Sequence, residues 1–214
     1  GAPIGVAIGM SSAVSMICMI PADVSFATSA QRIFAGSNSF SLIAIPFFIL
    51  AGNIMNNGGI ATRLVNCAKV ISGRMPGALA QSNVVANMLF GAISGSGAAA
   101  AAAMGGTIGP LEEKEGYDKN YSTAVNVASA PVGMLIPPSN TMIVYSSVAG
   151  SVSIAALFMA GYIPGLLWGG AVMILAGIMA KKRGYQAEQR VPVKVALKTF
   201  WQAIPSLLLI VIVI

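Results

Sequence analysis

Long apolar stretches without a charged residue alternate with short charged segments along the chain. The long uncharged stretches are residues 1–22, 33–62, 75–111, 120–180 and 202–214. A helix of about 20 such residues is long enough to cross the hydrocarbon core of a bilayer. The pattern therefore predicts an all-α polytopic membrane protein, with transmembrane helices at about 1–20, 38–57 and 154–180.

The stretch 75–111 is too long for one span, because as a single helix it would measure about 55 Å at about 1.5 Å per residue. Near its middle the sequence reads Ser94-Gly95-Ser96-Gly97, which suits a bend because glycine tolerates turn conformations. We therefore expect two shorter arms that fold back on each other. The length predicts a re-entrant helical hairpin over 77–110.

The distribution of basic residues supports this hairpin, because Lys and Arg collect on the cytoplasmic side of short membrane loops. Apart from Arg32, they form three groups: Arg63, Lys69 and Arg74; Lys114 and Lys119; and Lys181, Lys182, Arg183, Arg190, Lys194 and Lys198. If 75–111 crossed the membrane once, the first group would face the opposite side from the other two. If the stretch returns to the side it entered, all three groups lie on one face.

A second interruption lies at Pro137-Pro138, inside the uncharged stretch 120–180. Two adjacent prolines remove two backbone donors, so a continuous helix cannot run through them. We expect a discontinuous helix over 120–149, with a new half-helix beginning near Asn140 or Thr141 and capped by Ser139 or Asn140. Irregular backbone at membrane depth is tolerated only inside protein or beside a wet site.

Both interruptions combine an unwound segment with small polar residues and the start of a half-helix. The half-helix of the hairpin is expected over Ala98–Ala103. Half-helix N-termini attract anions, while exposed carbonyl and serine oxygens suit sodium. Taken alone, the glycine-rich bend is also typical of close packing between helices. Taken alone, the proline pair is also typical of a structural kink. For Asn83, Asn87, Asn126 and Ser129, hydrogen bonding between helices is favoured over lining a cavity.

Composition narrows the function further. The net charge is +6, but the basic residues flank apolar stretches, so nucleic-acid binding is not expected. Histidine is absent and no Asp, Glu, Lys or Arg lies inside a predicted span, which argues against an intramembrane enzyme or a proton relay. Segments 60–74 and 190–202 are basic and amphipathic, which predicts either helices at the membrane surface or ordinary basic loops, and the second segment is followed by the start of another span. The chain begins with Gly-Ala-Pro and ends inside an apolar run, so we expect a fragment.

Five motifs in order resemble the large membrane subunit of tripartite ATP-independent periplasmic (TRAP) transporters. They are Gly-Ala-Pro-Ile-Gly at residues 1–5, Ile-Pro-Phe-Phe-Ile-Leu-Ala-Gly at 45–52, Ser-Gly-Ser-Gly-Ala at 94–98, Leu-Ile-Pro-Pro-Ser-Asn at 135–140 and Leu-Phe-Met-Ala-Gly-Tyr-Ile-Pro-Gly at 157–165. The resemblance implies a bacterial inner-membrane secondary transporter driven by sodium. Its expected partners are a periplasmic binding protein that delivers an organic acid and a small four-helix membrane subunit, separate or fused.

The resemblance also implies an elevator-type fold. Residues 1–74 would form scaffold helices and an interfacial arm helix, and 75–153 half of a transport domain. Residues 154–214 would supply a transmembrane helix, a cytoplasmic surface segment and the start of the next span. The family has a second, inverted hairpin in its C-terminal half, which is absent from this sequence.

Carried over to this sequence, the family's site falls on the two interruptions. The expected sodium ligands are Ser94, Gly95, Ser96, Gly133 and Pro137. The expected substrate contacts are Gly97, Pro138, Ser139 and Asn140. An amide at Asn140 favours a more hydroxylated substrate, such as a sialic acid, over a four-carbon dicarboxylate.

Two other functions remain open at the level of sequence. Ser139-Asn140-Thr141 also matches the hairpin tips of single-component sodium–dicarboxylate carriers. An intramembrane enzyme or a purely structural scaffold is the alternative from another class. Dependence of uptake on a binding protein would separate the first alternative from a TRAP transporter, and sodium-dependent uptake itself would exclude the second.

Overall fold

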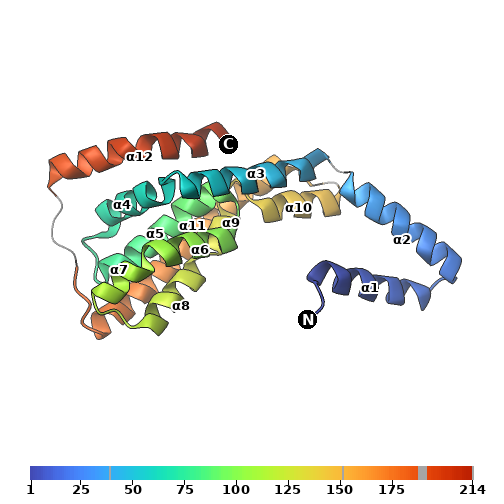
Figure 1. Cartoon of the computed structure of the whole chain (residues 1–214), viewed down its shortest axis with the longest axis horizontal. Coiled ribbons are helices and arrows are strands. Elements are labelled where there is room, and N and C mark those ends of the chain that lie inside the picture. Colours follow the sequence, from blue (N-terminus) through green and yellow to red (C-terminus); the bar gives the residue numbers. More distant parts are fainter. Residues whose placement is uncertain (39, 151, 188–191, 214) are drawn as a thin grey trace. The chain divides into compact units, whose positions relative to one another are not determined.

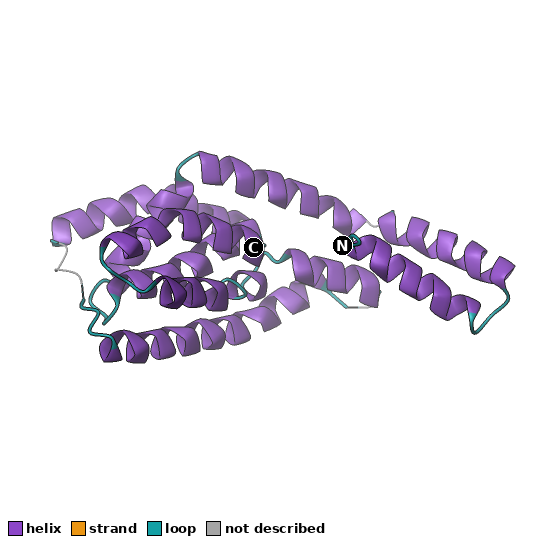
Figure 2. Ribbon diagram, turned by 60° about the horizontal axis from the view of Figure 1, so that its bottom comes forward, coloured by secondary structure: helices purple, strands orange, loops and turns teal. Residues whose placement is uncertain are grey.

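The computed structural model describes residues 1–38, 40–150, 152–187 and 192–213, and all regular elements in these ranges are helices (Figure 2). The chain forms two compact units, Gly1–Ile43 and Ala44–Ile214. This division follows compactness and does not test the assignment of 1–74, 75–153 and 154–214 to scaffold and transport parts, which stays a prediction.

The first unit contains α1 (Ile4–Ile17) and α2 (Ala22–Ser37), which are joined by a short turn (Figure 1). Helix α1 has 14 residues, fewer than the 1–20 span that the sequence predicts, because the chain leaves the helix at Cys18 and Pro21 starts the next one. Helix α2 was not expected. Asp23 and Arg32 interrupt its apolar pattern, but neither residue prevents helix formation.

The second unit begins within α3 (Phe40–Asn57), which is followed by α4 (Ile60–Ser72). The structure therefore confirms helices at the predicted span 38–57 and surface segment 60–74. Leu64 and Val65 of α4 are buried against neighbouring helices, and Ile71 is exposed. The apolar face of α4 thus packs largely onto protein, and not wholly onto a lipid surface as the sequence suggests.

The predicted fold-back over 77–110 is present. Helix α5 (Ala78–Ser94) is followed by a turn, and α6 (Gly97–Thr107) and α7 (Gly109–Lys114) run back along it (Figure 1). Phe90 of α5 and Ala100 and Met104 of α6 share one buried cluster. At the turn, Gly95 has a φ of +63°, a conformation that glycine adopts without a steric penalty. Whether this hairpin enters a membrane from one side stays a prediction.

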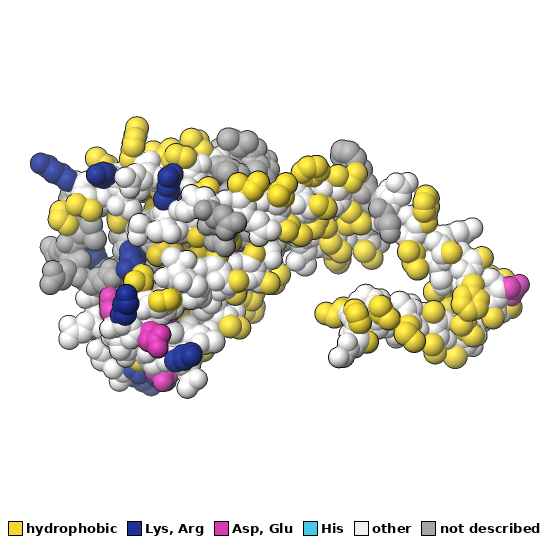
Figure 3. Space-filling view, viewed as in Figure 1, with side chains coloured by type: hydrophobic (Ala, Val, Ile, Leu, Met, Phe, Trp, Pro, Cys, Tyr) yellow, Lys and Arg dark blue, Asp and Glu magenta, His cyan; other side chains and the backbone are white. Residues whose placement is uncertain are grey.

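Both ends of the hairpin meet at one place, which is called its base below. Leu79 at the start of α5 packs in one buried cluster with Tyr117, which follows α7, and with Tyr121. Tyr185 stacks on Tyr117 with ring centroids 4.2 Å apart, and its hydroxyl accepts a hydrogen bond from the Asp118 N–H at 2.8 Å. Many Lys and Arg side chains gather at this end of the unit (Figure 3). The arrangement agrees with a return of the chain to the basic face.

The predicted discontinuous helix is also present. Helices α8 (Lys119–Ser129), α9 (Val132–Leu135) and α10 (Asn140–Ala149) follow one another. The axis bends by 49° between Lys119–Leu135 and Asn140–Ala149. Pro131 adds an interruption between α8 and α9 that the sequence analysis did not separate from the main break.

Helix α11 (Ile154–Lys182) is long and apolar enough to cross a membrane, and the bent pair Lys119–Leu135 and Asn140–Ala149 passes the same test when taken together. The buried residues of α11 are all small: Gly161, Gly165, Gly169, Ala176 and Ala180. Many of its large side chains face outward, with Ile163 and Leu167 70% and 68% exposed, while Val172 and Met173 pack against a buried cluster. Small residues toward protein and large apolar ones outward are typical of a helix at a lipid boundary.

The last helix, α12 (Val193–Val213), packs along α4. The sequence predicts a surface segment at 190–202 and a separate span after it, but within the described residues a single helix covers both. No glycine interrupts this part of the sequence, and Pro205 lies inside the helix. Residues 190 and 191 of the predicted segment lie outside the described residues.

Candidate functional site

The two interruptions predicted from the sequence meet in the second unit. The N–H of Asn140, at the start of α10, donates a hydrogen bond to the carbonyl oxygen of Gly95 at 3.2 Å. A Cβ atom on Gly95 would lie 3.0 Å from the carbonyl oxygen of Pro138 and 3.4 Å from Cγ of Asn140. The hairpin tip, residues 94–97, and the break, residues 136–139, therefore form one site.

At the tip, Ser96 is the N-cap of α6, and its Oγ accepts a hydrogen bond from the Ala99 N–H at 3.3 Å. Oγ of Ser94 is buried, 3.4 Å from the Ser96 carbonyl. Among the described residues, the N–H groups of Gly97 and Ala98 have no hydrogen-bond partner. The tip thus offers serine oxygens beside the positive end of a helix dipole.

At the break, Ser139 is the N-cap of α10, which confirms one of the two alternatives predicted from the sequence, Ser139 and Asn140. Its Oγ accepts from the Met142 N–H at 3.3 Å and donates to the Met134 carbonyl. The carbonyl oxygens of residues 136–138 accept no hydrogen bond from any described residue. Oδ1 of Asn140 is also buried, with no hydrogen-bond partner in the described ranges. Such unpaired oxygens in a buried region call for a ligand, water or an ion.

Glycines hold the tip against the break at very short range. A Cβ atom on Gly91 would lie 2.1 Å from Cα of Gly133, so the backbones of α5 and α9 are in direct contact. A Cβ atom on Gly97 would lie 3.0 Å from the Ala130 carbonyl oxygen. Any side chain at these positions would push the two interruptions apart.

Helix α11 supports the break from another side. A Cβ atom on Gly161 would lie 2.3 Å from the carbonyl oxygen of Leu135, and one on Gly165 would lie 2.8 Å from the side chain of Ile136. These contacts were not predicted from the sequence. The available signal was the spacing of Gly161, Gly165 and Gly169 by four residues, which places them on one helix face as membrane helix contacts require.

The four polar residues between tip and base form the expected bonds between helices. Nδ2 of Asn87 lies 2.8 Å from Ser129 Oγ and 3.0 Å from Asn126 Oδ1, both on α8, and 2.8 Å from Asn83 Oδ1. Nδ2 of Asn126 in turn donates to the Ala101 carbonyl of α6 at 2.9 Å. Hydrogen bonding between helices is thus confirmed, and it fixes both arms of the hairpin to α8.

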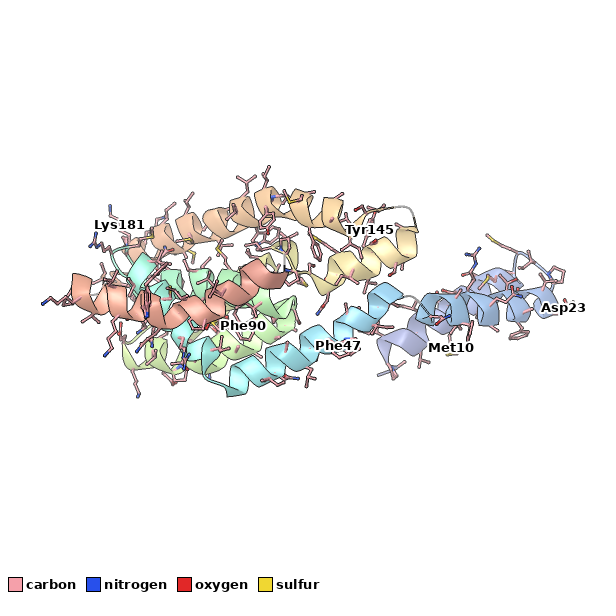
Figure 4. The ribbon with its side chains drawn as sticks, turned by 90° about the horizontal axis from the view of Figure 1, so that it is seen from above. Met10, Asp23, Phe47, Phe90, Tyr145 and Lys181 are labelled. Carbon is pink, nitrogen blue, oxygen red and sulfur yellow. The ribbon has the colours of Figure 1, made fainter. Side chains whose placement is uncertain are left out.

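An open, mainly apolar hollow of about 570 Å³ lies beside the break, lined in part by Ile45, Asn140 and Tyr145. Figure 4 shows Tyr145 and Lys181 at opposite ends of this unit. The stretches 75–111 and 120–180 contain no charged residue. An anion in this region would therefore meet helix N-termini and amide groups.

The structure brings most of the predicted residues together, although no contact tests their roles. Gly95, Pro138 and Asn140 touch one another, and Ser94 and Ser96 share the tip turn. Gly97 packs on α8 and Gly133 on Gly91, and both have structural contacts. Pro137 and Ser139 are buried within the break. Because the Ser139 hydroxyl already makes two hydrogen bonds, Asn140 is better placed than Ser139 to reach a ligand.

Known proteins resemble the chain along its full length. The family model for the DctM component of tripartite ATP-independent periplasmic transporters matches residues 1–214. The chain is 53% identical over 214 residues to the uncharacterized protein YgiK of Salmonella typhimurium, covering all of this chain and 49% of that protein. In Vibrio cholerae, a C4-dicarboxylate TRAP transporter large permease protein is 39% identical over 215 residues, covering all of this chain and 47% of that protein. A sialic acid TRAP transporter large permease protein of the same organism is 37% identical over 218 residues, covering all of this chain and 49% of that protein. The chain thus spans about half the length of these relatives.

Proposed function

The chain belongs to the DctM family, the large permease component of tripartite ATP-independent periplasmic transporters, and on this basis we propose that it contributes half of a sodium-coupled organic-acid symporter. The transporter works in a bacterial inner membrane. It receives its substrate from a periplasmic binding protein and assembles with a small four-helix membrane subunit, separate or fused. The transport domain carries the substrate across by an elevator movement.

One observation supports this proposal most directly: the tip of the hairpin and the break are joined at Gly95 and Asn140, and unpaired oxygens surround the junction. Discontinuous helices that meet at mid-membrane are the usual architecture of secondary transporter sites. Carbonyl and hydroxyl oxygens are suitable ligands for a hard cation such as sodium. The site needs no carboxylate for this role.

We assign sodium to the side of the site formed by Ser94, Gly95, Ser96, Gly133 and Pro137. The substrate contacts are Gly97, Pro138, Ser139 and Asn140, with Asn140 as the leading contact. The N-terminus of α6 attracts the substrate carboxylate, and the unpaired amide oxygen of Asn140 accepts a hydrogen bond from a hydroxyl group of the substrate. The remaining contacts come from the half of the protein that lies outside this chain.

A sialic acid is our preferred substrate class, because a hydroxylated sugar acid uses the amide of Asn140 and a four-carbon dicarboxylate does not need it. The names of the relatives do not decide this point, since both substrate classes occur at similar identity. Competition for uptake by each compound separates them. Transport of a dicarboxylate without transport of a sialic acid would reject our preference.

The decisive experiment measures uptake in proteoliposomes that contain the full-length subunits, a candidate binding protein and an imposed sodium gradient. We compare the wild-type protein with Ser96→Ala and Ser153→Ala. Both serines cap a helix: Oγ of Ser96 accepts a hydrogen bond from the Ala99 N–H at 3.3 Å, and Oγ of Ser153 accepts one from the Ala156 N–H at 3.4 Å. Ser96 caps α6 at the tip, whereas Ser153 caps α11 and is not part of the proposed sodium site. We expect Ser96→Ala to require a higher sodium concentration, and Ser153→Ala to behave like the wild type.

Three results would count against the proposal. Equal sodium dependence of Ser96→Ala and Ser153→Ala would remove Ser96 from the sodium site. Uptake without a sodium gradient would refute the coupling. Uptake that does not need the binding protein would favour a single-component sodium–dicarboxylate carrier, which the family match disfavours.

A further inference from the structure

A second cavity lies at the base of the hairpin, away from the tip, and contains several polar side chains. Its volume is about 380 Å³, and its lining includes Asn83 of α5, Glu112 of α7 and Ser122 of α8. From Asn83 to Gly95 the distance along α5 is about 18 Å at about 1.5 Å per residue. This cavity is therefore separate from the proposed transport site.

Two buried oxygens in the base cavity lack partners. Glu112 is only 1% exposed, and its Oε1 has no hydrogen-bond partner. Oγ of Ser122 is also buried without one. An ionised carboxylate is unfavourable inside protein unless a cation or several hydrogen bonds compensate for lost hydration. Among the described residues, Glu112 and Ser122 thus place two oxygens without a hydrogen bond of normal geometry on neighbouring helices beside one cavity.

The charged groups around the cavity do not supply that ligand. Lys119 and Glu113 line the cavity together with Tyr117, yet among the described residues no ion pair within 4.0 Å involves Glu112. The ion pair found at this end joins Asp118 to Arg183 at 3.1 Å. Burial raises the pKa of Glu112 to about 7, while weak hydrogen bonding from the Ser122 and Asn83 side chains lowers it, so both side chains lie close to the carboxyl group. Within the part of the chain that the structure describes, the carboxyl group therefore has no ion-pair partner.

We propose that the base cavity binds a monovalent metal cation of the sodium type, with Oε1 of Glu112 and Oγ of Ser122 as protein ligands and water as the remaining ligands. Oxygen ligands favour a hard cation, and one carboxylate balances one positive charge. Asn83 is not counted as a ligand, because its Oδ1 already lies 2.8 Å from the Asn87 amide nitrogen. The bound cation links α7 to α8 and so fixes the returning arm of the hairpin.

Thermal unfolding of the full-length subunit in detergent tests this site without any transport measurement. Sodium replaces choline from about 1 mM to about 100 mM at constant ionic strength and at about pH 8, where Glu112 is ionised. We compare Ser96→Ala, which weakens the proposed tip site, with the double variant Ser96→Ala/Glu112→Gln. Glu115→Gln in the Ser96→Ala background is the matched control, because Glu115 is an exposed acid at the end of α7.

We expect sodium to raise the Tm of Ser96→Ala and of the control. The double variant should lose this Tm shift, or the sodium concentration that gives half of the shift should be at least about tenfold higher. Ser122→Ala in the same background keeps the carboxylate and should weaken sodium binding several-fold, which covers the case that Glu112→Gln does not fold.

Identical sodium titrations of Ser96→Ala and the double variant would overturn the proposal. Loss of the whole sodium response in Ser96→Ala alone would overturn it too, while leaving the proposed transport function intact. A Tm that depends on pH but not on sodium would identify the ligand of Glu112 as a proton, which also contradicts the proposal.

Discussion

Substitution of Gly91 by alanine tests the direct contact between the hairpin and the break. The added Cβ atom would lie 2.1 Å from Cα of Gly133, whereas carbon atoms in contact are normally about 3.5–4.0 Å apart. The two backbones must therefore separate by about 1.5 Å. The hydrogen bond from the Asn140 N–H to the Gly95 carbonyl, now 3.2 Å long, would not survive such a displacement.

The cost of Gly91→Ala can be estimated against a matched control. Overpacking costs about 1–3 kcal/mol, and more when backbone atoms are involved because they cannot rotate away. Alanine also gains about 1 kcal/mol of helix propensity over glycine. Gly106→Ala, in α6, gains the same propensity, but its Cβ atom meets nothing within 4 Å. We expect Gly91→Ala to be about 1–3 kcal/mol less stable than Gly106→Ala.

The assay combines thermal unfolding in detergent with uptake in proteoliposomes. Gly106→Ala should unfold at or above the wild-type Tm and transport normally. Gly91→Ala should unfold at a lower Tm and lose most uptake, because misplacement of a site by about 1 Å can reduce its activity about 100-fold. If the two variants have the same Tm and the same uptake, the contact between α5 and α9 does not hold the site together.

Three further predictions follow from the hairpin and its base. Cysteines placed at Arg74 and Lys114 should both react with an impermeant thiol reagent from the cytoplasmic side, and reaction from opposite sides would exclude a re-entrant hairpin. Burial raises the pKa of Glu112 from 4.5 to about 7, so the folded state holds a proton that the unfolded state releases, and stability should fall as pH rises from about 4.5 to about 7. The loss is about 3 kcal/mol in the absence of sodium, and Glu112→Gln should lack this pH dependence in unfolding measurements. Asn126→Ala should reduce stability by about 1–3 kcal/mol and so lower the Tm, because Nδ2 of Asn87 and the carbonyl of Ala101 would each lose a hydrogen-bond partner. An unchanged Tm would show that these bonds are not needed.

The local features of the site were predictable from the sequence. Backbone chemistry predicts the bend at residues 94–97, the break at the proline pair and a cap at Ser139 or Asn140 without any tertiary information, because glycine, proline and capping residues act on their immediate neighbours. The fold-back of the hairpin followed from length and from the placement of Lys and Arg. These predictions depend on backbone conformation within a few residues, or on the thickness of the membrane and the side on which basic residues lie.

The features that depend on long-range contacts were not predictable in the same way. Nothing local to Gly91 or Gly133 indicates that they touch, since their contact requires two separate helices to approach. The burial of Glu112 was also missed, because an acid beside Glu113 and Lys114 reads as part of an exposed surface. The helix α2 was missed because its charged residues obscure a pattern that is otherwise compatible with a helix.

The attachments of α11 restrict what can move in this protein. Its Trp168 donates to the Ala128 carbonyl at 2.9 Å, its Met173 carbonyl accepts from Gln81 at 2.9 Å, and its Ala176 carbonyl accepts from the Tyr121 hydroxyl at 2.8 Å. Gln81 belongs to the hairpin, whereas Tyr121 and Ala128 belong to α8, which Asn87 joins to the hairpin. Helix α11 therefore cannot slide along α5 and α8 without breaking these bonds. In the proposed elevator movement, a displacement of the hairpin would carry α8 and α11 with it. The proposal therefore places the surface that slides on the exposed apolar side chains of α11, such as Ile163 and Leu167.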